Sequence, residues 1–473
     1  MLNQKVISSK SIFLIIIFIF KISRIVAGLV PDRAGHVAVI NGNQIIFMGG
    51  SRFISPANPI RSQIRLYNLS DEVFSLSLSS QFSTSSPPYV DLSDTSARMK
   101  FGSEKGTAVL GGASKEIVFL IGGMQQNLTR LNEIDKNSNI TSNQTFMIEE
   151  ISKTYNMTSQ LVFFYQPYGK SWSYLLDQKG TPPSRRRSTS TVIDSKGIIY
   201  IFGGRVQVDT GSPILVCYND LYTFDTVLLS WNKVNAANVP SPRSHAAPVL
   251  LPSGKILYIG GVSQTQPGME ADLINMNEIP VFDTISSTWS YKYANQSILI
   301  QPRSGHTATL MPNNNEIIII GGNSNHHYNY TTTTPIFLSL NIAKEPYEYS
   351  ELITFGDKPP PLAYHTANLY KNYLIIAFGN ITSNFTQSVE INSHICLLDI
   401  PCKTWVTTFT PDKSICGSSI GGESSINVGM IVGIIISVIV LVIALGILYI
   451  KRHKLKGLDH RKIYRARPQE QLN

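Results

Sequence analysis

The sequence predicts an all-β ectodomain built from repeats, followed by one C-terminal transmembrane α-helix. An apolar run that ends in glycine recurs six times between residues 45 and 380, and Val428–Ile450 is a 23-residue stretch without a charged side chain. Val, Ile, Tyr, Phe and Thr dominate the ectodomain runs, and helical periodicity is absent from them. This composition favours short β-strands.

Each repeat carries the same signals in the same order. An Arg- or His-bearing segment comes first, then the apolar run with its glycines, and an aromatic residue closes the unit. The glycines are Gly49, Gly50, Gly122, Gly123, Gly203, Gly204, Gly260, Gly261, Gly321, Gly322 and, with Asn380 replacing the second glycine, Gly379. The closing residues are Tyr89, Trp172, Trp231, Trp289, Tyr349 and Trp405, spaced by 83, 59, 58, 60 and 56 residues. Four short strands repeated with such a period predict a six-bladed β-propeller.

The glycines are expected to end the second strand of each blade, where neighbouring blades pack together. A residue without Cβ lets the backbone pass close to a neighbour and can adopt a positive φ. We expect the closing Trp or Tyr to be that neighbour. A phosphate-binding glycine loop would open a helix, and no helix is expected after these pairs.

The glycine pairs and closing aromatic residues together resemble the kelch repeat, over roughly residues 30–408. The segments PLAYHTANL (Pro361–Leu369) and KTWVTTF (Lys403–Phe409) resemble those of membrane-anchored fungal kelch proteins, which are grouped with the galactose oxidase central-domain superfamily. The chain departs from the pattern where Tyr closes units 1 and 5, and where Leu362 and Ala363 replace the usual Arg segment. A seventh, degenerate blade within the long second unit is the alternative to six.

The two ends of the chain predict a type I single-pass membrane protein. Residues 1–27 have the basic and apolar character of a signal peptide. We expect an ectodomain over 28–409, a Ser/Gly-rich stalk over 410–427, a membrane span over 428–450 and a cytoplasmic tail over 451–473. Basic residues directly after the span place the tail in the cytoplasm. The protein is then expected at the cell surface or in a secretory-pathway membrane.

The positive charge of the chain belongs to its ends. Of the formal net charge of +9, the tail contributes +6 and the leader +4, so the ectodomain is close to neutral. The charge therefore reflects topology and gives no indication of nucleic-acid binding.

Nine Asn-x-Ser/Thr sequons predict N-glycosylation: Asn68, Asn127, Asn139, Asn143, Asn156, Asn295, Asn329, Asn380 and Asn384. Only four cysteines occur, Cys217, Cys396, Cys402 and Cys416, so the fold must be held by its core. A disulfide of Cys402 with Cys396 or with Cys416 is compatible with the sequence.

The loops that follow the glycines are long, whereas those between the first two strands of each unit are short. Because alternate loops of an antiparallel meander lie on opposite faces, the long loops share one face. We predict that this face binds a protein or glycan ligand. The alternative is that the insertion over 124–160, which carries four sequons, shields it.

Metal and enzyme interpretations find little support in the sequence. The adjacent His326 and His327 lack acidic or thiol partners nearby. The resemblance implies that Tyr364–His365 could match a Tyr–His copper pair of the galactose oxidases. However, His365 matches the repeat's own His36, His245 and His306, which favours a structural role, and no Tyr–Cys pair matches the family's cross-link. We therefore predict no catalytic residues, metal or cofactor.

The function predicted from the sequence is that of a membrane-tethered binding or adhesion module. A copper-radical oxidase is the alternative, and a sorting or scaffold protein that uses its tail is a third option. Small residues four apart in the span, Gly429, Gly433 and Ser437, predict weak homodimerisation.

Overall fold

The computed structural model describes residues 32–52, 68–93, 98–136, 144–155, 161–174, 178–325, 330–383 and 390–412. The chain divides into two compact units, Met1–Cys416 and Gly417–Asn473, and every described residue belongs to the first. The predicted signal peptide, span and tail lie outside the described residues, as does the predicted stalk beyond Asp412. No helix within the described ranges is long and apolar enough to cross a membrane.

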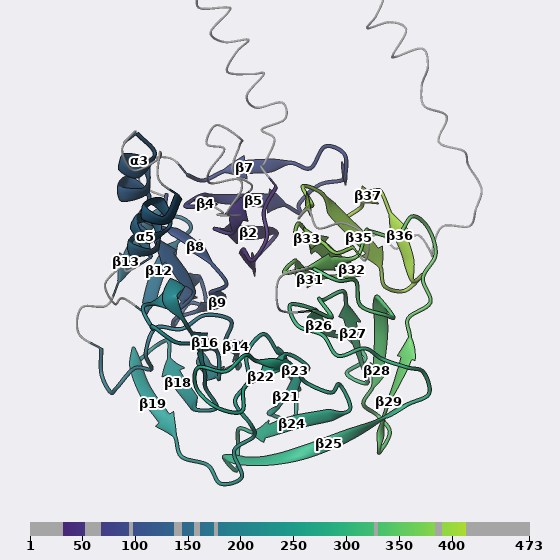
Figure 1. Ribbon diagram of the computed structural model, residues 1–473. Helices are drawn as coiled ribbons and strands as arrows, with labels where there is room; N and C mark the ends of the chain where they lie inside the picture. Colours follow the sequence, from purple (N-terminus) through teal and green to yellow (C-terminus); the bar gives the residue numbers. More distant parts are fainter. Residues whose placement is uncertain are drawn as a thin grey trace, which may run out of the picture. The chain divides into compact units, whose positions relative to one another are not determined.

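The described residues form six groups of four antiparallel strands, here called blades 1 to 6 (Figure 1). Four of them are separate sheets, and blades 4 and 5 are joined into one eight-stranded sheet by a parallel pairing of their fourth strands. Blades 1 to 3 contain β1 (Val37–Asn41), β2 (Gln44–Met48), β5 (Val73–Ser77) and β7 (Tyr89–Asp91); β9 (Thr107–Gly111), β10 (Ile117–Ile121), β12 (Val162–Gln166) and β13 (Ser171–Tyr174); and β14 (Ser190–Ile193), β15 (Ile198–Phe202), β18 (Leu221–Asp225) and β19 (Ser230–Val234). Blades 4 to 6 contain β20 (Ala247–Leu250), β21 (Lys255–Ile259), β24 (Glu278–Asp283) and β25 (Thr288–Gln296); β26 (Thr307–Leu310), β27 (Glu316–Ile320), β28 (Phe337–Asn341) and β29 (Tyr347–Glu351); and β31 (Thr366–Tyr370), β32 (Tyr373–Ala377), β35 (Ile395–Asp399) and β36 (Thr404–Val406).

The blades are arranged in a closed ring (Figure 1). The first strand of each blade contacts the first strand of the next, in the order β1, β9, β14, β20, β26 and β31, and β31 contacts β1 again. The strands follow the sequence signals in the expected order: the first strand follows the Arg/His segment, the second ends at the glycines and the fourth carries the closing aromatic residue.

The hydrophobic core lies between blades. Phe202 of blade 3 and Tyr258 and Trp289 of blade 4, for example, belong to one cluster, with the Phe202 and Trp289 ring centroids 4.8 Å apart. Five further clusters join the other neighbouring pairs, including blades 6 and 1. Each closing aromatic residue lies in the fourth strand of its blade and opposite a third-strand residue, as Trp231 lies opposite Phe224. Trp289 thus packs against the preceding blade, which makes apolar burial the main force that joins the ring.

The glycine pairs lie where a blade meets the backbone of the next blade. The second residue of each pair donates its N–H to a carbonyl there: Gly50 to Ser103, Gly123 to Arg186, Gly204 to Arg243, Gly261 to Arg303, Gly322 to Leu362 and Gly379 to Arg33, at 2.7–2.9 Å. A Cβ on Gly321 would lie 2.0 Å from the Leu362 carbonyl oxygen. The expectation that the closing Trp or Tyr is the close neighbour was therefore wrong, because a carbonyl of the next blade fills that place.

Blade 6 departs from the glycine pattern at a different residue than the sequence suggested. Phe378 takes the first glycine position, with a φ of 56°, and Gly379 takes the second. Asn380, which the repeat pattern placed second, follows the pair and lies in β33. The Phe378 ring lies against the rings of Phe47 and Phe74 of blade 1, at centroid distances of 5.5 and 6.0 Å, and so fills the junction that closes the ring.

Short additional elements lie outside the four-stranded sheets. They are β3 (Ser51–Arg52), β4 (Asn68–Leu69), β6 (Phe82–Ser83), β8 (Gly102–Glu104), β11 (Met124–Gln126), β16 (Arg205–Val206), β17 (Val216–Cys217), β22 (Val262–Ser263), β23 (Asp272–Leu273), β30 (Leu362–Ala363), β33 (Asn380–Ile381), β34 (Glu390–Ile391), β37 (Thr408–Phe409) and the 3₁₀-helix η1 (Val208–Thr210). Most of them form two- or three-stranded ladders in the loops that follow the glycines.

The long loop of blade 2 contains two helices, α3 (Leu128–Lys136) and α5 (Gln144–Thr154). They pack together through Leu131, Ile134, Met147 and Ile151. The expectation that the ectodomain lacks helical periodicity was wrong here, because apolar residues three and four apart line one face of each helix. The described part of this loop forms helices where a degenerate seventh blade was considered.

Candidate binding site at the channel mouth

In each blade, the residue two positions before the first strand has a positive φ, between 54° and 65°. These residues are Gly35, Lys105, Ser188, His245, Gly305 and Tyr364. Their backbones are linked around the ring: N–H groups donate from Gly35 to Tyr364, from Lys105 to Gly35, from Ser188 to Lys105, from His245 to Ser188 and from Tyr364 to Gly305, at 2.8–3.1 Å. The six residues therefore form an inner ring on the side of the long loops.

The residue before each inner-ring position pairs with the residue after the glycine pair of the same blade. The pairs are Ala34–Ser51, Glu104–Met124, Arg187–Arg205, Ser244–Val262, Ser304–Asn323 and Ala363–Asn380. We call these residues, together with the inner ring, the channel mouth. Among the six pairs only Glu104, Arg187 and Arg205 are charged, so charge at the mouth is concentrated in blades 2 and 3.

Arg187 and Arg205 lie opposite each other in antiparallel pairing, with both backbone N–H···O distances at 3.0 Å. The Asp209 carboxylate in η1 binds Arg187 through both oxygens, at 3.1 Å from Nε and 2.9 Å from Nη2. Asp209 therefore neutralises one of the two guanidinium groups, and the pair retains an excess of positive charge.

Two nitrogen atoms of this arginine pair are buried without a hydrogen-bond partner among the described residues: Nη1 of Arg187 and Nε of Arg205. The Arg187 side chain is only 3% exposed. Burial, and secondarily the adjacent Arg187 charge, lower the pKa of Arg205 to about 10. Unpartnered buried donors are costly, which makes them a candidate site for an anionic ligand group.

Other inner-ring side chains add hydrogen-bonding and aromatic groups to the mouth. The Tyr364 ring lies 4.9 Å from the Lys105 ammonium and 5.6 Å from the His245 ring. The glycine at position 305 makes room for it, because a Cβ there would lie 2.7 Å from the Tyr364 ring. Ser188 Oγ lies 2.8 Å from Nε2 of His245. A ligand that enters the mouth would meet one aromatic ring and several polar groups.

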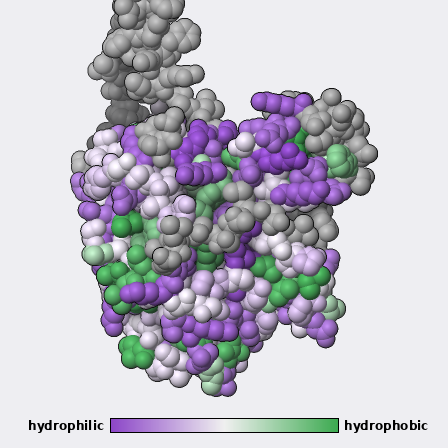
Figure 2. Space-filling view, turned by 90° about the vertical axis from the view of Figure 1, so that its left-hand side faces the viewer, coloured by the Kyte–Doolittle hydropathy of each residue, from purple (hydrophilic) through white to green (hydrophobic). Residues whose placement is uncertain are grey.

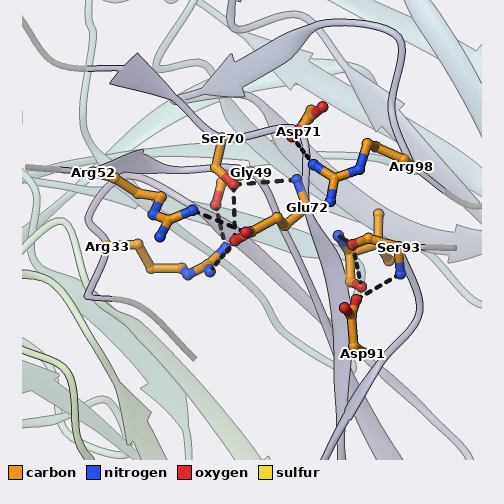
Figure 3. Close-up of polar contacts among 10 residues, drawn as sticks. Arg33, Gly49, Arg52, Ser70, Asp71, Glu72, Asp91, Ser93 and Arg98 are labelled. Carbon is orange, nitrogen blue, oxygen red and sulfur yellow. Dashed lines mark hydrogen bonds and ion pairs between the residues drawn. The ribbon is translucent and has the colours of Figure 1, made fainter. Parts of the chain in front are cut away.

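The Arg segments that the sequence singled out have a separate, structural role. Arg33, Arg186 and Arg303 each donate from Nη1 to the carbonyl of the first glycine in their own blade, at 2.9–3.1 Å. In blade 1, Glu72 accepts from Arg33 at 2.8 Å and from Arg52 at 2.9 Å (Figure 3). These buried guanidiniums hold the strand that ends in the glycines.

The Tyr364–His365 pair does not form a shared metal site. Tyr364 lies at the mouth, whereas His365 is buried between blades, with Nε2 3.0 Å from Thr307 Oγ1. Burial lowers the pKa of His365 to about 4. His365 corresponds to His36 and His306, as the sequence suggested, but His245 lies one residue earlier, on the inner ring.

No group of three or more His, Cys, Asp or Glu in the described part of the chain is placed to hold a metal ion. The adjacent His326 and His327 lie outside the described residues.

The sequons differ in their surroundings. Asn127 and Asn295 are exposed, whereas Asn380 is only 5% exposed and paired on both sides within its sheet, which argues against a glycan at that position. Asn68 begins β4. The remaining sequons, Asn139, Asn143, Asn156, Asn329 and Asn384, lie outside the described residues.

The cysteines resolve one of the open disulfide pairings. Cys402 is disulfide-bonded, and Cys217 and Cys396 are free thiols. Cys396 is therefore not the partner of Cys402. Cys416, the other cysteine that the sequence offered, lies outside the described residues.

Comparison with known proteins places the fold. A family model described as the KLHDC2/KLHL20/DRC7 Kelch-repeats domain matches residues 139–380, which is just over half of the chain. The chain belongs to the kelch-repeat family. Its resemblance to kelch repeats is thereby confirmed, and kelch domains generally mediate protein binding. The similarity to fungal membrane-anchored kelch proteins stays a prediction.

Individual relatives of this kelch chain match only in part. A Rho GTPase-activating protein, gacHH of Dictyostelium discoideum, is 35% identical over 113 residues, covering 24% of this chain and 7% of the relative. Acyl-CoA-binding domain-containing protein 5 of Arabidopsis thaliana is 25% identical over 223 residues, covering 47% of this chain and 31% of the relative. The solved structure of YjhT aligns with a TM-score of 0.47 and 14% identity, over 67% of this chain and 84% of that one. The chain thus spans less than a third of either curated relative.

Sequence reasoning identified the long-loop face but missed the residues that distinguish it. Arg205 begins one of the long loops of the predicted face but was not singled out, and Lys105 and Arg187 lie outside those loops. Arg205 had a usable signal, because it follows a glycine pair where the other blades have Ser, Met, Val or Asn. The facing position of Arg187 became visible only with the strand pairing.

Proposed function

We propose that this chain is a type I single-pass membrane glycoprotein, and that its six-bladed kelch propeller binds an acidic segment of a partner protein at the channel mouth. The proposal combines the protein-binding role of kelch domains with the charge distribution of this mouth. Proteins are the partners proposed, and a glycan ligand is the alternative that the test below also addresses.

The arginine pair of blade 3 carries this proposal. Asp209 pairs with Arg187 and not with Arg205, and each arginine retains a buried nitrogen without a partner among the described residues. An incoming carboxylate could accept hydrogen bonds from both and offset their mutual repulsion. Lys105, which is paired with Glu104 at 3.1 Å, and the Tyr364 ring would border the same group.

A neutral glycan fits this charge distribution less well. Hydroxyl groups would satisfy the free donors but would leave the second guanidinium without a counter-charge. A carboxylate supplies both acceptors and charge. We therefore favour Asp- or Glu-bearing peptide segments over neutral sugars.

The membrane topology is supported by two features of the described ectodomain. Cys402 is disulfide-bonded, and stable disulfides are typical of proteins that pass through an oxidising secretory compartment. Two sequon asparagines, Asn127 and Asn295, are exposed. The span itself is proposed from the apolar sequence of Val428–Ile450 and from the basic residues that follow it.

Binding to a defined peptide pair tests the function. Full-length protein in phosphatidylcholine nanodiscs is titrated with fluorescein-labelled Gly-Glu-Glu-Glu-Glu-Gly and with its Gln counterpart, and fluorescence anisotropy is followed. We expect the Glu peptide to bind and the Gln peptide to bind at least tenfold more weakly. Arg205→Gln should abolish the preference, whereas Arg98→Gln should retain it, since Arg98 pairs with Asp71 elsewhere. Equal binding of both peptides, or preferential binding of an uncharged oligosaccharide, would overturn the proposal.

A further inference from the structure

The face opposite the channel mouth carries the turns between the first and second and between the third and fourth strands. We call it the short-loop face. In blades 2, 3 and 4, the turn between the third and fourth strands exposes an apolar side chain to solvent. Tyr168 is 84% exposed, Leu228 64% and Ile285 83%. Val227, beside Leu228, is 50% exposed. Three consecutive blades therefore present an apolar residue at the same turn, where tight turns usually carry polar ones.

These residues belong to tight turns and not to the folded core. In blade 3, Asp225 accepts N–H groups from Val227 and Leu228, and in blade 4, Asp283 accepts from Ile285 and Ser286, at 2.8–3.1 Å. The turn backbone is thus held in place while the apolar side chains point away from it. Figure 2 views the flank on the side of blades 2 and 3, where hydrophobic patches interrupt a largely hydrophilic surface.

The chain leaves the ring on this same face. β37 pairs with β6, which lies in the connection between the third and fourth strands of blade 1. Asp412, the last described residue, forms an ion pair with Lys371 in the first turn of blade 6, at 2.5 Å. Both contacts are with short-loop-face turns. Fifteen residues separate Asp412 from the predicted span at Val428, and at about 3.3 Å per residue they reach at most ~50 Å.

We infer that the short-loop face of blades 2 to 4 rests on the lipid bilayer, with Tyr168, Leu228 and Ile285 inserted into its interfacial region. The inference rests on the proposed membrane tether, because the tether holds the face close to the bilayer and makes weak contacts sufficient. Tyr and aliphatic side chains are the types that enter the interfacial layer. The channel mouth would then point away from the membrane, toward a partner.

Charge does not drive this contact. The turns of blades 2 to 4 on this face and the strand ends beside them contain four lysines and four carboxylates: Lys115, Lys170, Lys196, Lys255, Glu116, Asp194, Asp225 and Asp283. The face is therefore neutral and suits a zwitterionic phosphatidylcholine surface. Raising the salt concentration should leave the contact unchanged, in contrast to a polybasic segment on anionic lipid.

Photo-crosslinking to lipid tests the inference in the full-length protein. The protein is reconstituted into phosphatidylcholine vesicles that contain a diazirine-bearing phosphatidylcholine, irradiated, and mapped by mass spectrometry. We expect lipid adducts in peptides that contain Tyr168, Leu228 and Ile285, at equal yield in low and high salt. The triple variant Tyr168→Ser/Leu228→Ser/Ile285→Ser should lose them several-fold. A control variant, Ile214→Ser/Met269→Ser, changes exposed apolar residues on the long-loop face and should retain them.

The outcomes separate the inference from the proposed topology. Adducts within 428–450 but none in the three turns would overturn the inference and leave the tether in place. Equal adduct yields around Met269 and around Ile285 would also overturn it. Absence of adducts from 428–450 would contradict the tether itself, and the inference would fall with it.

Discussion

Blades 1 and 3 each bring two arginines and one carboxylate together, with opposite results. In blade 1, Glu72 binds both Arg33 and Arg52, one through each oxygen, at 2.8 and 2.9 Å. In blade 3, Asp209 places both oxygens on Arg187 and leaves Arg205 without an ion pair among the described residues. The same composition therefore yields a satisfied structural cluster in one blade and an incomplete one in the other.

The position of the carboxylate accounts for the difference. Glu72 lies just before the third strand, between the buried Arg33 and the more exposed Arg52. Burial alone would raise the pKa of Glu72, but Arg33 and Arg52 outweigh that effect and lower it. Asp209 approaches from η1 and reaches Arg187 only. Buried charge stabilises a fold where it is fully paired, and it marks a candidate binding site where it is not.

The largest effect is expected from breaking the satisfied cluster. Arg33→Met should lower the free energy of unfolding by about 3–5 kcal/mol, because it removes the buried one of the two arginine partners of Glu72 and the donor to the Gly49 carbonyl. Denaturant titration followed by tryptophan fluorescence measures it. The double variant Arg33→Met/Glu72→Met, which also removes the carboxylate that has lost its buried partner, should recover part of the loss. A loss below about 1 kcal/mol in the single variant would contradict a structural role.

The second largest effect is expected in the pH dependence of stability, to which blade 1 contributes through a buried histidine that blade 3 lacks. Blade 1 has His36 where blade 3 has Thr189. His306 and His365 occupy the same position in blades 5 and 6, and we call these three residues the histidine seam. Burial lowers the pKa of all three, aided at His36 by Arg33 and at His306 by Arg303, to about 4 for His365 and about 3 for His306. These pKa values lie below the ordinary value of 6.5. At a pH between the two values, the unfolded state therefore binds more protons than the folded state.

Stability should therefore fall as the pH drops from about 6.5 to about 4, by up to about 1.4 kcal/mol per pH unit for each histidine. Denaturant midpoints at a series of pH values measure the slope. His365→Gln should reduce this slope by the contribution of one histidine, about 1.4 kcal/mol per pH unit. Thr189→Ser, at the corresponding position of blade 3, should leave the slope unchanged. A slope that His365→Gln does not alter would mean that the acid sensitivity arises elsewhere.

Breaking the incomplete cluster should affect binding instead of folding. Arg205→Met removes a guanidinium whose charge is opposed by Arg187, so we expect no loss of thermal stability. Affinity for the Glu peptide should fall at least tenfold, about 1.4 kcal/mol or more. Melting temperature and peptide titration on the same sample separate the two effects. If Arg205→Met were destabilised, Arg205 would have a structural role like that of Arg33, and the binding role would be contradicted.

The smallest effect concerns the histidine seam itself. His36 bonds Thr366 of the preceding blade, and His365 bonds Thr307, at 2.9 and 3.0 Å. Ala247 of blade 4 occupies the position that corresponds to Thr307 and Thr366, and both ring nitrogens of His306 lack a hydrogen-bond partner among the described residues. Ala247→Thr should supply one and raise stability by about 1 kcal/mol. Ala247→Val, similar in shape without the hydroxyl, is the control.

Much of the fold could be predicted because the same pattern of strand-forming residues and glycines recurs along the sequence. A run ending in Gly203–Gly204 is ambiguous once, but its recurrence with a closing aromatic residue indicates a four-stranded unit and its order. The prediction placed Trp231 and Trp405 in fourth strands, and both lie there. The helices α3 and α5 were missed, because they occur in one loop and have no counterpart in the other repeats.

The candidate site was harder to predict, because its residues come from different repeats. Arg187 and Arg205 are 18 residues apart in the sequence and meet through one pairing, while Lys105 and Tyr364 meet only because the ring closes. Spacing along the chain cannot reveal such a contact. The long-loop face could be predicted from loop lengths, but the charged part of it could not.

The sequence alone determined that this chain forms repeated four-stranded units with glycine pairs at their junctions, since strand propensity and conformational freedom are local properties of residues. The tertiary structure decided what the glycines face, which arginines are neutralised and where Phe378 completes the ring. Those outcomes depend on distances between atoms of different blades. Such distances are set by how whole sheets pack around a common centre, and no local stretch of sequence contains them.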